Sequence, residues 1–127
     1  MEIEVRSFPE PRTAEVRCAL GEFTAQWGGR PTDTPGVYVI EWTIDVELTW
    51  GQNATASPAP GPVILTEQDH VLLRGRLQPN NDGTAYLNLG DTSVHLDVTE
   101  PLPHPALTGW TDFRLKPTEI ELYPYST

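Results

Sequence analysis

Three acidic residues, Glu41, Asp45 and Glu47, occupy odd-numbered positions in a stretch whose even-numbered positions are apolar. On a strand, side chains two positions apart point to the same face and lie about 6.5–7 Å from each other. Carboxylates at that spacing can flank a small substrate or help to hold a divalent cation. Calcium and magnesium sites, however, gather several oxygen ligands from loops, whereas this stripe is straight. We therefore expect a solvated strand face, with these residues as candidates for partner binding, and no metal site.

A second group, Ser93, His95 and Asp97, contains the residue types of a nucleophilic triad. These side chains also alternate along one predicted strand, too far apart for the contacts of about 2.6–3.2 Å that a triad requires. No Gly-x-Ser-x-Gly motif is present to position a nucleophile. The other two histidines, His70 and His104, show no zinc-ligand spacing. The sequence therefore predicts no catalytic residue and no cofactor, and it favours a protein that is not an enzyme.

The aromatic residues form a third group that could bind a ligand or a partner. Trp42 and Trp50 fall on the apolar positions of the stretch that carries the acidic residues, so we expect them in the core. In a barrel wide enough to hold a ligand, Tyr38, Trp42 and Trp50 would line the cavity. Aromatic side chains outside this stretch are better placed to anchor an interface. These candidates for partner contact are Trp110, Tyr123 and Tyr125.

The elements that must position these residues are strands. From residue 37 to residue 50, apolar and polar residues alternate with period two. We expect one continuous or once-bulged strand here, with even-numbered side chains buried and odd-numbered ones exposed. Shorter segments with the same alternation predict strands at residues 3–5, 16–20, 23–27, 71–77, 85–89, 94–98 and 120–122.

Glycine and proline punctuate these strands. Gly75 interrupts one of them, which indicates a bulge, a sharp bend or a close approach of another backbone. The 13 prolines argue against long helices, so we expect at most one short helix, near residues 67–69 or 103–107. Residues 53–62 carry no large apolar side chain. We expect a mobile surface loop over residues 51–62.

Many short strands joined by turn residues favour an all-β fold, either a small antiparallel β-barrel, OB-like or related, or a sandwich. We expect residues 1–127 to form a single domain. Residues 71–125 resemble a five-stranded OB-type barrel, with a glycine-containing strand, two hairpin strands, a proline-rich connection and a closing strand. No sequence motif accompanies this resemblance, so it implies no ligand.

Charge and composition restrict the partners. Eighteen acidic against eight basic residues give a net charge of -10, which repels nucleic-acid phosphates. No run of about 18 apolar residues is present to span a membrane. The acidic N-terminus does not resemble a signal peptide, and the lone Cys18 cannot form an internal disulfide, so we expect a cytoplasmic location.

These observations favour a non-catalytic module that binds another protein, such as an inhibitor or immunity-type partner of a basic protein. The alternative is a ligand-binding or small catalytic barrel, with an aromatic-lined cavity and Asp45, Glu47 or His95 as acid–base groups. A filled barrel would support the first hypothesis, and a cavity of roughly 300 Å³ or more with a convergent ionisable group the second. Exposed β edges also allow copies of the chain to pair.

Overall fold

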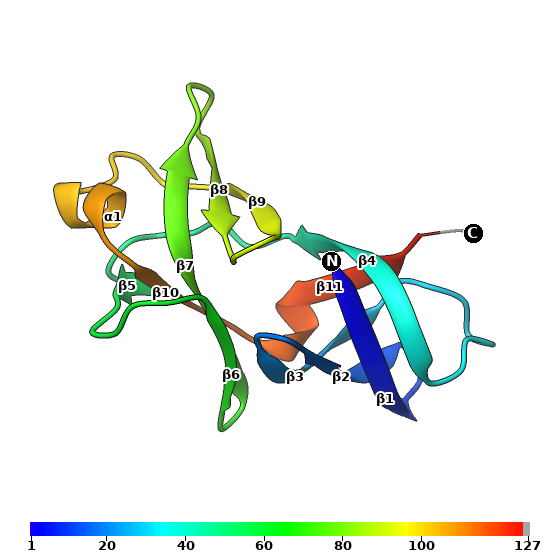
Figure 1. Ribbon diagram of the computed structural model, residues 1–127. Helices are drawn as coiled ribbons and strands as arrows, with labels where there is room; N and C mark the ends of the chain where they lie inside the picture. Colours follow the sequence, from blue (N-terminus) through cyan, green and yellow to red (C-terminus); the bar gives the residue numbers. More distant parts are fainter. Residues whose placement is uncertain (126–127) are drawn as a thin grey trace.

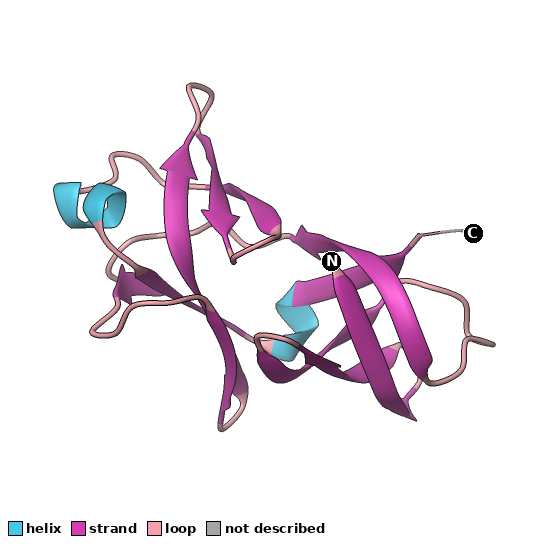
Figure 2. Ribbon diagram, viewed as in Figure 1, coloured by secondary structure: helices cyan, strands magenta, loops and turns pink. Residues whose placement is uncertain are grey.

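The computed structural model describes residues 1–125, and strands dominate it (Figures 1 and 2). The elements, in chain order, are β1 (Glu2–Glu10), β2 (Thr13–Cys18), β3 (Gly21–Trp27), β4 (Gly36–Ile44), β5 (Ala54–Ala56), β6 (Val63–Glu67), β7 (His70–Pro79), β8 (Thr84–Asn88), β9 (Ser93–Asp97), the helix α1 (His104–Thr108), β10 (Thr111–Leu115), the short 3-10 helix η1 (Pro117–Glu119) and β11 (Ile120–Pro124). The prediction of an all-β fold with a small barrel and at most one short helix is confirmed, although the barrel contains one parallel pair of strands and is not purely antiparallel. Within residues 1–125, no helix has the length and hydropathy needed to cross a membrane.

Five strands close into a barrel in the order β1-β2-β3-β11-β4. Neighbours pair antiparallel except for β3 and β11, which run parallel, so the barrel is mixed. Its last strand, β11, fits between β3 and β4 after the chain has built the whole second sheet (Figure 1). The barrel thus combines residues 2–44 with 120–124. The expected barrel within residues 71–125 is wrong. Among the strands of that segment, only β11 belongs to the barrel.

The expected single strand over residues 37–50 is also wrong, because β4 ends at Ile44. Ile44 pairs with Ile120, the first residue of β11, so the ladder between these strands stops there. The chain then crosses to the second sheet, where Leu48 bridges Val98. The alternation of burial nevertheless persists, since Leu48 is fully buried and both Asp45 and Glu47 are exposed. The period-two pattern indicates which side chains face the core. Here the side chains up to Ile44 face the barrel part of the core, and Leu48 faces the part next to the second sheet.

The remaining strands form an antiparallel sheet in the order β5-β10-β7-β8-β9, with β6 also paired to β7. The sequence patterns missed β5, β6 and β10. The strand β5 lies inside the expected loop of residues 51–62, pairs with β10 and buries Ala54 completely. The helix α1 lies at one of the two expected places, whereas at the other place Glu67 ends β6 and residues 68–69 make the turn to β7. Gly75 fits the expected close approach, because a Cβ there would lie 2.3 Å from the carbonyl oxygen of Asn88.

The barrel and the second sheet meet where β3 begins. The buried side chains of both parts form one cluster. The backbone N–H of Ile64 in β6 donates to the carbonyl of Leu20 at 2.9 Å, and the hydroxyl of Thr66 donates to the carbonyl of Glu22 at 2.9 Å. Between them stands Gly21, with φ of +147° and no room for a side chain, because a Cβ would lie 1.9 Å from the carbonyl oxygen of Ile64. This backbone contact fixes one part against the other.

The hydroxyl of Thr111 in β10 is buried and has no hydrogen-bond partner. Burying an unpaired hydroxyl costs about 1–3 kcal/mol. We expect Thr111→Val to raise the free energy of unfolding by about 1 kcal/mol in urea denaturation. The control is Thr84→Val, which removes a hydroxyl that is hydrogen-bonded to Asp82 and Asn80 and should lower stability. A loss of stability in the Thr111 variant would show that this hydroxyl has a partner in solution.

Candidate interaction surface

The outward face of β4 and β11 combines carboxylates with exposed apolar side chains. In the ladder between these strands Tyr123 lies directly opposite Glu41. The backbone N–H of Tyr125 donates to the carbonyl of Val39 at 2.9 Å, which carries the pairing beyond the end of β11. Tyr123 is 42% exposed and Tyr125 53%. We call this surface the acid–tyrosine face, and its members are Val37, Val39, Glu41, Asp45, Glu121, Tyr123 and Tyr125.

A groove of about 680 Å³ runs between this face and the loop that joins β3 to β4. The strand side contributes apolar and aromatic side chains, and the loop side contributes two glycines and two charged residues. The lining residues are Gly28, Gly29, Arg30, Asp33, Val37, Tyr38, Val39, Tyr123, Pro124 and Tyr125. Three tyrosines in one open groove form a surface on which a partner's side chains can pack.

Asp33 holds the loop side of the groove in place. Its Oδ2 accepts a hydrogen bond from the indole Nε1 of Trp27 at 2.9 Å and another from the backbone N–H of Arg30 at 2.8 Å. The ring of Trp27 packs edge-on against Tyr38 with 4.9 Å between centroids, and the Tyr38 hydroxyl donates to the carbonyl of Thr34. These bonds fix the loop before any partner arrives, so little ordering entropy remains to oppose binding.

Gly28 positions Tyr123 on this face. A Cβ at Gly28 would lie 2.6 Å from Cε1 of Tyr123, so the ring packs directly against the glycine backbone. The N–H of Gly28 donates to the carbonyl of Leu122 at 2.8 Å, which ties the start of the loop to β11. Sequence reasoning missed Gly28, Gly29 and Asp33 as parts of the site. The signal available in the sequence was the Gly-Gly pair directly after a predicted strand.

The negative charge of this face is largely uncompensated. Within residues 1–125, Glu41, Asp45 and Glu47 form no ion pair, whereas Glu121 lies 3.7 Å from Arg12. A second, adjoining groove of about 410 Å³ carries four carboxylates and no basic side chain; its lining residues are Thr43, Asp45, Val46, Glu47, Thr118, Glu119 and Glu121. Glu47 thus lies at the border of the acid–tyrosine face.

The tyrosine hydroxyls lie close to these carboxylates. Hydrogen bonding to Glu121 raises the pKa of Tyr123 above its ordinary value, and hydrogen bonding to Glu41 does the same for the pKa of Tyr125. In both cases the neighbouring negative charge disfavours the phenolate. Glu41 therefore has Tyr123 opposite it in the ladder and the Tyr125 hydroxyl beside its carboxylate.

The other predicted contact residue, Trp110, lies apart from this face. It lies directly before β10 of the second sheet, where the guanidinium of Arg76 stands 4.8 Å from the centre of its ring. The three residues proposed to line a cavity do not come together either. Trp42 stacks on Phe23 with 5.5 Å between ring centroids, Trp50 bridges Ala54 beside the second sheet, and Tyr38 lines the groove.

The barrel interior is filled by side chains. The buried residues that fill it are Ile3, Val5, Ala14, Val16, Phe23, Ala25, Trp27, Ile40, Ile44, Ile120 and Leu122. The residues of the apparent triad make other contacts. Ser93 donates its hydroxyl to Asn88 at 2.6 Å, and the ring of His95 packs against Tyr86.

No family model matches this chain, and the comparisons with curated proteins and with solved structures yield no match. Within the described residues, no three or more His, Cys, Asp or Glu side chains are grouped so that they could hold a metal ion. The acid–tyrosine face is therefore the candidate site, on the strength of its own geometry and charge.

Proposed function

We propose that this protein is a non-catalytic binding module whose acid–tyrosine face binds a basic protein partner. The observation that carries the proposal is the coincidence of exposed tyrosines on β11 and just after it with two carboxylates, Glu41 on β4 and Asp45 directly after β4, that form no ion pair within residues 1–125. A partner that covers the tyrosines would bury apolar surface, and its cationic side chains could form ion pairs with Glu41 and Asp45. Inhibition or neutralisation of that partner is the concrete role we assign to the complex.

The overall charge favours the same kind of partner. A net charge of -10 attracts a cationic protein over a distance of about 8–10 Å at moderate salt, beyond the range of direct contact. Such steering raises association rates by about tenfold to a thousandfold and weakens as ionic strength rises. Tyrosines then supply contact area at low entropic cost. The filled barrel interior supports a site on the outside of the barrel over a cavity within it.

Charge reversal on the face tests this proposal. With a basic partner captured from the native host, we expect Glu41→Lys with Asp45→Lys to slow association by about tenfold or more at low salt. Both side chains point into solvent, so the fold should survive. Stopped-flow or surface-plasmon measurements over a range of salt concentrations give the rates.

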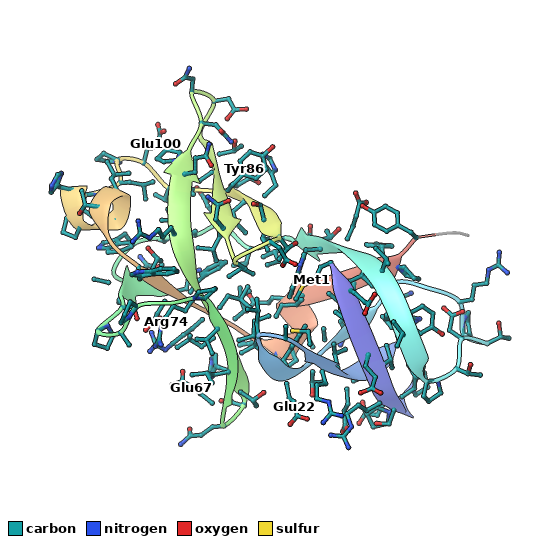
Figure 3. All side chains as sticks on the ribbon, in the orientation of Figure 1. Met1, Glu22, Glu67, Arg74, Tyr86 and Glu100 are labelled. Atoms are coloured by element: carbon teal, nitrogen blue, oxygen red, sulfur yellow. The ribbon has the colours of Figure 1, made fainter. Side chains whose placement is uncertain are left out.

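The matched control makes the same change in net charge on the second sheet, with Asp97→Lys and Glu100→Lys. Both residues are exposed, and Glu100 is labelled in Figure 3 on the part of the molecule that carries β7, β8 and β9. We expect this variant to lose far less of the association rate than the first. Equal losses in the two variants would mean that only net charge matters and that the acid–tyrosine face is no binding site.

A further inference from the structure

The acid–tyrosine face has a feature that charge alone does not require: one carboxylate stands among aromatic rings. Glu41 lies directly opposite Tyr123, and its carboxylate neighbours the hydroxyl of Tyr125. Cβ atoms of directly opposed residues are about 4.5–5.5 Å apart. The Tyr123 ring packs on Gly28, which follows β3 on the other side of β11, so a group that touches both this ring and the Glu41 carboxylate has to lie across the outer face of β11. A carboxylate accepts about four hydrogen bonds, so Glu41 keeps acceptor positions for an incoming donor beside the Tyr125 hydroxyl.

Arginine fits this arrangement better than lysine does. Its guanidinium is planar, stacks on an aromatic ring and donates two parallel hydrogen bonds to a carboxylate. A lysine ammonium is a compact, strongly hydrated charge that cannot do both in one plane. On the acid–tyrosine face, a guanidinium lying across the ring of Tyr123 would present its N–H donors to Glu41.

The surroundings keep this arrangement fixed. Gly28 supports the ring of Tyr123 from the loop side, and Asp33 holds the loop through the hydrogen bonds of its Oδ2. On the loop side Arg30 contributes one positive charge to the lining of the groove. It comes from the loop, whereas Glu41 and both tyrosines come from β4 and the β11 end of the chain, so the strand side remains acidic.

We propose, on the basis of the function proposed above, that the partner is held by an arginine side chain that stacks on Tyr123 and pairs with Glu41. We define the arginine slot by Glu41, Tyr123 and Tyr125, of which the two tyrosines line the same groove and Tyr125 has its hydroxyl beside Glu41. The partner is therefore a protein that presents arginine in an exposed or extended segment, and exchange of that arginine for lysine weakens the complex although the charge is kept.

Two synthetic peptides of equal length and charge, one of alternating arginine and glycine and one of alternating lysine and glycine, test this inference. At low salt we expect both to bind, because both are cationic, and the arginine peptide to bind about tenfold more tightly. Isothermal titration calorimetry gives the two dissociation constants. Glu41→Gln and Tyr123→Leu should each reduce the ratio of the two constants to about one, and Tyr125→Leu should reduce it in part.

The control is Tyr86→Leu, which removes an exposed tyrosine of β8 on the second sheet (Tyr86 is labelled in Figure 3) and should leave the ratio unchanged. Circular dichroism identifies any variant that fails to fold; Tyr125, which is more exposed than Tyr123, provides a second aromatic change. Equal binding of the two peptides to the wild-type protein would overturn the arginine slot and leave the basic-partner proposal standing. Binding of neither peptide would overturn both.

Discussion

A Gly21→Ala variant is expected to lose about 3–5 kcal/mol of unfolding free energy, the sum of backbone strain and steric overlap. Gly21 has φ of +147°, a conformation that L side chains rarely adopt. Its Cβ would lie 1.9 Å from the carbonyl oxygen of Ile64, an atom of the backbone that cannot rotate away. Relief of the overlap requires β6 to move away from β3, which breaks the hydrogen bond between Ile64 and Leu20.

Gly36→Ala separates the two causes of this loss. Gly36 has nearly the same φ, +155°, but no atom lies within 4 Å of the position of its Cβ. The Gly36→Ala variant has the backbone strain without the steric overlap, and it should lose about 1–3 kcal/mol of unfolding free energy. Urea denaturation followed by tryptophan fluorescence measures both variants. If Gly21→Ala is no less stable than Gly36→Ala, the close packing of β6 on the start of β3 is wrong.

The second large effect is expected at Asp112, whose carboxylate pairs with Arg74 across β10 and β7. The Nε of Arg74 lies 2.7 Å from Oδ1 of Asp112, and the two side chains are 15% and 3% exposed. Hydrogen bonding to Asp112 raises the pKa of Arg74, so the guanidinium stays charged in this site. Asp112→Ala leaves that charge without its partner, and we expect a loss of about 3 kcal/mol in urea denaturation.

Two further variants distinguish a buried ion pair from a general loss of charge. Glu67→Ala breaks the exposed pair between Glu67 and Arg114, which has a similar distance of 3.2 Å, and should cost less than about 1 kcal/mol. Arg74→Met combined with Asp112→Leu removes both charges and should recover much of the loss of Asp112→Ala. If the double variant is as unstable as Asp112→Ala, the unpaired charge of Arg74 is not the cause of the lost stability.

Local patterns in the sequence predict strands well because burial alternates wherever a strand covers a core. The long alternation around Trp42 correctly predicts which side chains face the core from Tyr38 to Leu48. Ile40, Ile44 and Leu48 are buried there, whereas Tyr38, Trp42 and Val46 are half-buried. The alternation does not predict the break after Ile44, because β4 loses its pairing partner where β11 begins, and β11 lies more than 70 residues away in sequence. The membership of the barrel depends on the same long-range pairing, so the residues of one segment could not reveal it.

The candidate site was predictable in part for a similar reason. Glu41, Tyr123 and Tyr125 stand out by residue type, and the pairing of β4 with β11 brings them together. Trp110 is of the same type but lies on the second sheet, which residue type alone does not reveal. Gly28 and Asp33 were missed because their roles, a close contact with an aromatic ring and two hydrogen bonds, exist only in the folded chain.

Chemical-shift mapping tests the acid–tyrosine face most directly. Amide signals of the ¹⁵N-labelled protein are followed while the arginine–glycine peptide is added at low salt. We expect the largest shifts in β4, in β11 and in the loop over residues 28–35, with small changes in β8 and β9. Largest shifts on the second sheet, or small shifts spread over the whole surface, would contradict a binding site formed by Glu41, Tyr123 and Tyr125.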